Sequence, residues 1–454
     1  MHLLSSLSWL AIGANALSVD HSSGADVAAE HKSGGSHKDC VIPKTPGTAK
    51  KHCPYSYAYY PNWAVYAKNV TVTQIPAHLF THLSYAFADV RPRDGQVILS
   101  DIPADTQRLY PGDDQKAPGK NLYGNLKQLY LLKKKYRYLN TCLAIGGATY
   151  SVNITSMLPS ATKRETFARS AANLAGQLGF DCVEIDYEHV KNKDEAENIV
   201  DLLKRLRAAL DKLEIESKAT ARFLIGYATP AGKDNYKLLD FPRMNEYVDI
   251  FNFMAVDYAG ATWSKKSGFL DNLYPSKKNP AATEFNTNSG IHDYLHEYKV
   301  PSHKIVLQNP LYGRAFAQTK GIGKDFKGPG KDGSLGQEGI WFYKDLPPKG
   351  YNLKWTNDLE AVGSYSYDKA KKYLIACDTA EIVRAKVEYV KQKKLGGTSF
   401  WEVSQDRLHS DDANYPSLIA TAIEAYGGPD ALDKRMNNLN YPLSEYKNLQ
   451  NQMK

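Results

Sequence analysis

Short runs rich in β-branched and aromatic residues recur along residues 55–400, and longer stretches with helical periodicity lie between them. This alternation is typical of parallel strands joined by crossover helices. Helical examples are Leu122–Lys135 and Lys163–Leu178, with apolar residues three to four positions apart. Eight strands are predicted, at Ser56–Tyr60, Phe80–Ala86, Asn140–Ile145, Cys182–Asp186, Phe223–Thr229, Ile250–Met254, Lys304–Asn309 and Gly397–Phe400. Eight such repeats predict an α/β fold, the TIM (β/α)8 barrel.

One connection breaks this rhythm. About 70 residues separate the seventh predicted strand, which ends near Asn309, from a helix predicted at Ile382–Lys393. They contain glycine-rich turns and an aromatic run at 340–343. A structureless loop of that length is uncommon in a compact domain. We therefore predict a small α+β insertion at about 313–381, between strand 7 and the last helix-strand unit, that forms one wall of a cleft.

The N-terminal part has the composition of an export signal followed by a polar segment. The apolar run Leu3–Ile12 precedes Ala14–Ala16, a small-x-small cleavage pattern, and predicts a signal peptide over residues 1–16. Residues 17–54 have few large apolar side chains and are interpreted either as a disordered tail or as a pro-segment. No later segment has the ~18 continuous apolar residues of a spanning helix. We expect a secreted, extracellular monomer that does not bind a membrane.

The distribution of charge and two glycosylation motifs are consistent with an extracellular protein. The net charge of +8 is spread over short runs such as Lys133–Lys135 and Lys393–Lys394, which we interpret as solvated helix faces. A nucleic-acid site requires a concentrated basic stripe, so no nucleic-acid partner is predicted, and a polyanion site is the less favoured alternative. Asn69-Val70-Thr71 and Asn153-Ile154-Thr155 are acceptor motifs for N-glycosylation.

The five cysteines fall into three groups. Cys40 and Cys53 flank a stretch outside the predicted barrel and could pair in an oxidising compartment. Cys142 and Cys182 fall on predicted strands and are interpreted as small buried apolar side chains, while Cys377 has no evident partner. Because there is neither a zinc-type CxxC spacing nor a Cys/His cluster, we predict no structural metal, no metal in the functional site and no cofactor.

The segment 179–188, Gly-Phe-Asp-Cys-Val-Glu-Ile-Asp-Tyr-Glu, carries the chemical signal. Alternate residues of a strand share a face, so Glu184, Asp186 and Glu188 face the barrel interior. Glu188 lies at the C-terminal end, where active sites of these barrels are found. Three close carboxylates resist ionising together, so at least one pKa should rise, as a general acid requires. The alternative, a solvated antiparallel strand, requires the barrel prediction to be wrong.

The same segment resembles the DGxDxDxE signature of glycoside hydrolase family 18, here DCVEIDYE. Seven further motifs of that family follow the chain in order: 59–63 (YYPNW), 85–87 (YAF), 144–147 (AIGG), 228–232 (ATPAG), 254–258 (MAVDY), 310–314 (PLYGR) and 400–402 (FWE). The resemblance spans residues 55–448 and is strongest to the secreted endochitinases of filamentous fungi.

This resemblance implies an endo-acting, retaining, substrate-assisted hydrolysis of β-1,4-linked N-acetylglucosamine polymers, so chitin and its oligosaccharides are the implied partners. Glu188 would protonate the glycosidic oxygen while the substrate acetamide attacks the anomeric carbon. Asp186 would hold the acetamide N–H, and Glu184 would complete the catalytic carboxylates. Trp401 would form the floor under the reacting sugar. The other implied substrate-binding residues are Tyr59, Phe87, Gly146, Gly147, His189, Met254, Asp257, Tyr312 and Arg314.

Several positions depart from the family pattern. Glu184 stands where the family has aspartate, and Val256 replaces a tyrosine whose hydroxyl binds the acetamide carbonyl. Ala144 replaces a serine, Ala148 a sugar-stacking tryptophan, and His189 a residue that is commonly tyrosine. Losing one transition-state hydrogen bond costs about 10- to 1000-fold in rate. The site is therefore expected to be divergent.

Three hypotheses remain open. A chitinase of reduced or retuned activity is favoured, because retaining an unused buried acid pair costs stability. A catalytically impaired chitin-binding lectin that sequesters oligosaccharides is the alternative. An endoglucosaminidase acting on N-glycans is a third, and the predicted insertion argues against it because that wall deepens a cleft for linear chains.

Overall fold

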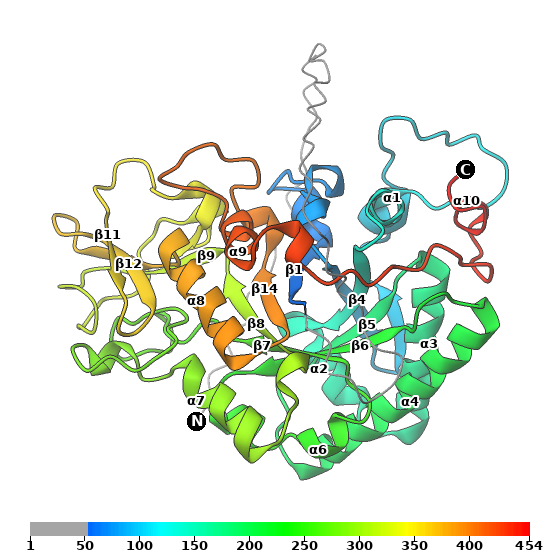
Figure 1. Ribbon diagram of the computed structural model, residues 1–454, viewed down its shortest axis with the longest axis horizontal. Coiled ribbons are helices and arrows are strands. Elements are labelled where there is room, and N and C mark those ends of the chain that lie inside the picture. Colours follow the sequence, from blue (N-terminus) through cyan, green and yellow to red (C-terminus); the bar gives the residue numbers. More distant parts are fainter. Residues whose placement is uncertain (1–52) are drawn as a thin grey trace. The chain divides into compact units, whose positions relative to one another are not determined.

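The structure is a computed structural model and describes residues 53–454. Its centre is a set of eight parallel strands: β1 (Tyr55–Pro61), β2 (His82–Arg91), β4 (Asn140–Gly146), β5 (Cys182–Asp186), β6 (Leu224–Pro230), β7 (Ile250–Met254), β8 (Ile305–Pro310) and β14 (Gly397–Trp401). Because β1 pairs with both β14 and β2, the sheet closes into a barrel. Helices surround it (Figure 1), and the predicted TIM barrel is confirmed.

The predicted strands all overlap observed ones, and β5 and β7 have the predicted bounds. The main difference is at β2, which continues past its predicted end at Ala86. Its extension pairs antiparallel with a short strand that the sequence did not reveal, β3 (Gln96–Leu99). The hairpin turn between them contains Gly95 at φ 78°, a left-handed conformation that glycine adopts readily.

Helices form the outer layer. They are α1 (Gly124–Lys135), α2 (Gly147–Met157), α3 (Ala161–Leu178), α4 (Lys193–Ser217), α5 (Lys233–Tyr236), α6 (Phe241–Met244), α7 (Thr287–His292), α8 (Ala380–Lys393), α9 (Leu418–Tyr426) and α10 (Lys447–Gln450). Helix α3 shows how local sequence sets the bounds. The Ser160 hydroxyl accepts a hydrogen bond from the Lys163 amide at its start, and Gly179 at φ 85° ends it.

The insertion is a five-stranded antiparallel sheet in the order β10-β9-β13-β12-β11. Its strands are β9 (Tyr312–Phe316), β10 (Ile340–Phe342), β11 (Lys354–Asp358), β12 (Gly363–Asp368) and β13 (Tyr373–Ala376). Two 3-10 turns, η8 (Ser334–Gly336) and η9 (Tyr343–Asp345), are its helical parts, and α8 follows β13. Figure 1 shows β11 and β12 to one side of the barrel strands.

Side chains of β5 alternate between two cores, as the sequence predicted. Val183 and Ile185 pack in the core between strands and helices. Cys182 packs inside the barrel with Tyr57 and Tyr59. This alternation directs Glu184 and Asp186 inward, since they lie two and four residues after Cys182 on the same face.

The interpretation of Cys142 and Cys182 as unbonded cysteines is wrong, because the two form a disulfide. They are register partners on neighbouring strands β4 and β5, with Cα atoms 4.4 Å apart. That separation is within disulfide range. Cys53 is also disulfide-bonded, whereas its expected partner Cys40 lies outside the described residues. Cys377 is buried and free.

The interpretation of Lys133 as part of a solvated helix face is also wrong. Its side chain is fully buried, with Nζ 2.7 Å from the Asp181 carboxylate and 2.7 Å from the Tyr441 hydroxyl. Tyr441 belongs to the C-terminal tail, where Asn437 also donates its side-chain amide to the carbonyl oxygen of Leu139. The tail therefore packs against the elements that lead into β4 and β5, and a charge run in the sequence could not reveal this contact.

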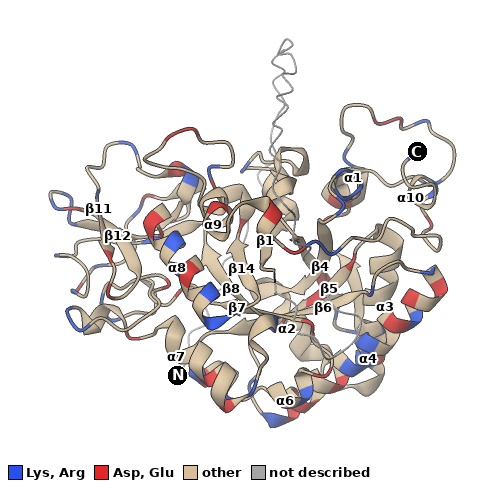
Figure 2. Cartoon of the chain, viewed as in Figure 1, with Lys and Arg blue, Asp and Glu red and all other residues tan. Residues whose placement is uncertain are grey.

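The remaining charges alternate in sign on the outer helices. Figure 2 shows Lys and Arg interleaved with Asp and Glu along α4 and α8. In residues 53–454 no helix is long and apolar enough to cross a membrane. The predicted signal peptide at 1–16 and residues 17–52 of the predicted tail or pro-segment lie outside the described residues.

Candidate active site

Asp186 and Glu188 lie at the C-terminal end of β5. Asp186 is almost fully buried at 5% exposure, and within residues 53–454 its Oδ1 atom has no hydrogen-bond partner. Burial raises the pKa of Asp186 well above its usual value, and the negative charges of Glu188 and Glu184 add to this. A buried acceptor without a partner is costly unless a ligand satisfies it. Asp186 is therefore prepared to accept a hydrogen bond from a bound molecule.

Glu188 is the more accessible member of the pair, with 28% of its side chain exposed. Burial raises its pKa to about 7, and the charge of Asp257 contributes. Its backbone N–H donates to the Ser151 hydroxyl at 2.8 Å, which links the end of β5 to α2. A carboxylic acid that stays protonated near neutral pH and is reached by solvent can act as a general acid.

His189 is adjacent to this acid. Its Nε2 atom lies 3.9 Å from Glu188 Oε2, and its Nδ1 atom is buried without a partner in the described part of the chain. Burial lowers the pKa of His189. The neutral form of the imidazole is therefore favoured, and this form adds no positive charge that would lower the pKa of Glu188.

Glu184 has a different environment from Asp186 and Glu188. It is fully buried, and four side chains from three other strands donate hydrogen bonds to its carboxylate. They are the hydroxyls of Tyr57 (2.7 Å), Tyr59 (2.6 Å) and Ser84 (2.6 Å) and the amide of Asn252 (2.5 Å). Burial raises the pKa of Glu184, and these hydrogen bonds partly offset that rise. We call Glu184 with these four partners the inner hub.

Small neighbours explain how the longer glutamate fits. On β4 the register partner of Glu184 is Ala144, and on β6 it is Gly226. A Cβ atom at Gly226 would lie 3.2 Å from both Cβ and Cγ of Glu184, tighter than an ordinary contact. The absence of a side chain at Gly226 therefore leaves space for the side chain of Glu184.

A second charged group lies between the barrel and the insertion. Arg314 on β9 binds Asp257 through two hydrogen bonds, at 2.6 Å from Nε and 2.7 Å from a terminal nitrogen. The Tyr312 hydroxyl donates to the same carboxylate at 2.7 Å. The insertion therefore fixes the carboxylate that raises the pKa of Glu188.

Aromatic rings line the barrel mouth. The ring centroid of Trp401 lies 5.2 Å from that of Tyr59 and 5.6 Å from that of Phe87. Trp63, at 6.3 Å from Phe87, extends the group. Trp401 and Trp63 are only partly buried. Exposed indole faces at this position offer apolar stacking surface for a sugar.

Two glycines allow the backbone of β4 to approach this site. Gly146 has φ 111° and Gly147 has φ 72°. A Cβ atom at Gly146 would lie 2.1 Å from the Asp186 carbonyl oxygen, and one at Gly147 would lie 2.7 Å from the Phe87 ring. Both positions require glycine because of conformation and space.

The structure places the remaining positions at the same end of the barrel. Met254 is the last residue of β7, half-buried, and Val256 follows it in the loop that carries Asp257. Ala148 is exposed at the start of α2. A methyl group there and an isopropyl group at Val256 provide neither a stacking surface nor a hydrogen-bond donor.

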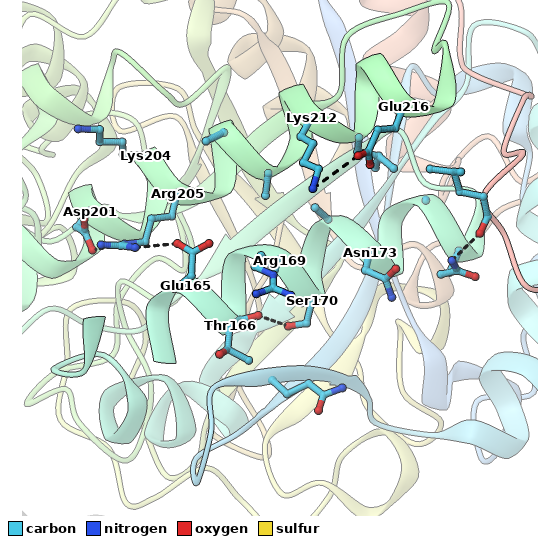
Figure 3. Close-up of a pocket in the computed structure, with 18 residues that line it drawn as sticks. Glu165, Thr166, Arg169, Ser170, Asn173, Asp201, Lys204, Arg205, Lys212 and Glu216 are labelled. Atoms are coloured by element: carbon cyan, nitrogen blue, oxygen red, sulfur yellow. Dashed lines mark hydrogen bonds and ion pairs between the residues drawn. The ribbon is translucent and has the colours of Figure 1, made fainter. Parts of the chain in front are cut away.

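A groove of about 920 Å³ lies elsewhere, on the outer face between α3 and α4 (Figure 3). Ion pairs such as Arg205 with Glu165 (2.7 Å) and Lys212 with Glu216 (3.6 Å) occupy its walls. Small residues, Ala172, Gly176 and Ala208, also line it. Since it lies in the helical layer, away from the C-terminal end of the barrel where active sites of this fold are found, we assign no catalysis to it.

Comparison with known proteins identifies the family. Residues 56–406 match the profile described as Glycosyl hydrolases family 18. Chitinase 1 of Aphanocladium album is 41% identical over 91% of this chain and 94% of its own length. Endochitinase 1 of Metarhizium robertsii is 40% identical over 87% of this chain and 90% of its own. The chain belongs to glycosyl hydrolase family 18.

This family 18 member is a glycosidase, and solved structures share its fold. Chitinase ChiA74 from Bacillus thuringiensis is 27% identical, with a TM-score of 0.75 over 83% of this chain and 70% of that chain.

Three residues of the inner hub, Tyr57, Ser84 and Asn252, were not predicted from the sequence. The alternation of side chains along a strand could have predicted that Tyr57 faces the barrel interior, because it lies two residues before Tyr59 on the same strand face.

Proposed function

We propose that this glycosidase hydrolyses chitin, the β-1,4-linked polymer of N-acetylglucosamine, by endo-acting, substrate-assisted catalysis with retained configuration. The observation that carries this proposal is the pair at the end of β5: a solvent-accessible Glu188 with a pKa of about 7 beside a buried Asp186 with an unpaired oxygen. The relatives above are described as chitinases and cover almost the whole chain.

The chemistry follows from the two environments. Glu188 donates its proton to the glycosidic oxygen, so the leaving sugar departs as a neutral alcohol. The acetamide oxygen of the substrate forms the new bond to the anomeric carbon, and the unpartnered Oδ1 atom of Asp186 accepts a hydrogen bond from the acetamide N–H, which stabilises the resulting positive charge. Water then opens this oxazolinium ion after giving a proton to Glu188. Positioning the acetamide before reaction removes much of the entropy cost.

Glu184 takes part indirectly in this proposal. Its carboxylate already accepts four hydrogen bonds from the protein, so it does not bind the substrate directly. Instead it positions Tyr59 beneath Trp401 and holds the inward-facing side chains of β5 in place. Val256 removes one hydrogen bond to the acetamide carbonyl and Ala148 one stacking surface. We therefore propose a rate below that of a site with both groups. Tyr59, Phe87, Gly146, Gly147, His189, Met254, Asp257, Tyr312, Arg314 and Trp401 form the substrate pocket.

We further propose that the protein acts outside the cell as a monomer and carries N-glycan. Asn69 is exposed in a loop, whereas Asn153 is half-buried within α2 and donates to Asp89 at 2.8 Å. Of the two acceptor motifs, the one at Asn69 is therefore the better placed.

The test is hydrolysis of a chitin hexasaccharide by the purified protein and by Glu188→Gln, with binding measured in both. We expect the variant to lose about 100- to 10,000-fold in kcat, because it keeps the shape but not the proton of the general acid. Its affinity for the hexasaccharide should persist. Binding without cleavage in either protein would instead indicate an oligosaccharide-sequestering lectin, and absence of binding in both would exclude chitin as the ligand.

A further inference from the structure

Two histidines project from one helical segment on the outside of the barrel. His292 is the last residue of α7, and His296 lies one turn later in the π-turn η6 (Asp293–Glu297). Both are exposed, with 67% of the His292 side chain accessible. The apolar residues of the same segment, Ile291 and Tyr294, are buried. The two imidazoles therefore occupy the solvent face and have no role in packing.

The separation of the rings matches a chelate. Their centroids are 4.7 Å apart with an interplanar angle of 49°. A metal ion bound to one nitrogen of each ring at about 2.1 Å, with a bond angle near 90–110°, places the ring centroids about 4.5–5 Å apart. Two histidines four residues apart on one helical face form the metal-binding pair of the HExxH motif. The separation of the rings is therefore compatible with both imidazoles binding one ion.

Neighbouring groups support the metal-binding state of His292. Its Nδ1 atom lies 3.7 Å from Asp293 Oδ1. Asp293 is itself held by Lys233 Nζ at 2.8 Å and by the Tyr236 hydroxyl at 2.7 Å. A carboxylate facing one ring nitrogen favours the tautomer whose other nitrogen, Nε2, presents its lone pair outward, as in carboxylate–histidine–metal triads.

We propose that His292 and His296 form a surface site for a divalent transition-metal ion, with Cu²⁺ bound more tightly than Zn²⁺. Within residues 53–454 no group of three or more metal-ligating side chains is assembled, so the protein supplies two ligands and water completes the coordination. Imidazole suits both ions, and the order follows the general preference of nitrogen sites. The site is independent of the glycosidase function, because it lies on the helical layer.

Isothermal titration of the full-length protein with CuCl2 and with ZnCl2 at pH 7, in a buffer that does not bind metals, tests the proposal. The chain has 12 histidines, so the comparison with variants carries the result. We expect the double variant His292→Ala/His296→Ala to lose one Cu²⁺ site. Each single variant should weaken that site at least tenfold, because a chelate becomes a single bond. His303→Ala, which removes another exposed histidine, should leave the site unchanged.

Thermal unfolding provides a second readout. Cu²⁺ should raise the Tm of the wild type more than that of the double variant, since a ligand that binds only the folded state stabilises it. Without metal the two proteins should unfold at the same temperature, because both histidines are exposed. Identical Cu²⁺ isotherms and identical metal-induced shifts for the wild type and the double variant would overturn the proposal.

Discussion

Two carboxylates on the same face of β5, two residues apart, have opposite surroundings. Glu184 in the inner hub accepts four hydrogen bonds and has both oxygens satisfied. Asp186 is equally inaccessible but has a buried oxygen without a partner. A buried carboxyl group whose hydrogen bonds are all made can hold its neighbouring side chains in place. A buried acceptor without a partner remains available to bind a ligand. The neighbours thus give two carboxyl groups of one strand different environments, and on this basis we propose a structural role for Glu184 and a catalytic role for Asp186.

The largest expected difference between Glu184 and Asp186 is in their contribution to the free energy of unfolding. Glu184→Ala should lower the free energy of unfolding by about 3–5 kcal/mol, because four buried donors lose their acceptor. Asp186→Ala is the matched control and should leave stability nearly unchanged, since the Asp186 side chain makes no hydrogen bond within residues 53–454. Urea unfolding of both variants measures the difference. Equal losses in the two would show that the inner hub is not structurally distinct.

The replacement of the family's tyrosine by Val256 provides a test of the catalytic pair. Val256→Tyr should raise kcat/KM for the chitin hexasaccharide by about tenfold or more, because the new hydroxyl can bind the acetamide carbonyl in the transition state. Val256→Phe adds the ring without the hydroxyl and is the control. A gain in both variants would assign the effect to packing, and a loss in both would mean that the pocket has been rebuilt around valine.

The pH dependence tests the electrostatics of Glu188. Its pKa is raised to about 7, first by burial and then by Asp257. Because the acid must be protonated, kcat/KM should fall about tenfold per unit above pH 7. Asp257→Asn removes a negative charge, which lowers the pKa of Glu188 and should move this limb to lower pH. Glu165→Gln on α3 is the control and should not move it. A limb that stays in place or shifts to higher pH in Asp257→Asn would contradict the coupling.

The sequence predicts what depends on periodicity and motif. Alternation along β5 placed Glu184 and Asp186 inside the barrel, and the length and turn composition of the connection after β8 predicted an insertion there. What it missed depends on register between strands. The Cys142–Cys182 disulfide requires two residues to be exact partners on β4 and β5, and the inner hub joins residues of β1, β2, β5 and β7. The buried contact of Lys133 depends on a tail more than 300 residues away in sequence.

The most direct measurement compares Asp186→Asn with Glu184→Gln in both kcat for the chitin hexasaccharide and free energy of unfolding. Asp186→Asn should lose about 100-fold or more in kcat at unchanged stability, because an amide cannot take on the negative charge that stabilises the oxazolinium ion. Glu184→Gln should lose stability and keep most of kcat, since the hydroxyls of Tyr57 and Ser84 can rotate to accept from its amide. Equal losses of kcat in both, at unchanged stability, would contradict the division between an inner hub and a catalytic pair.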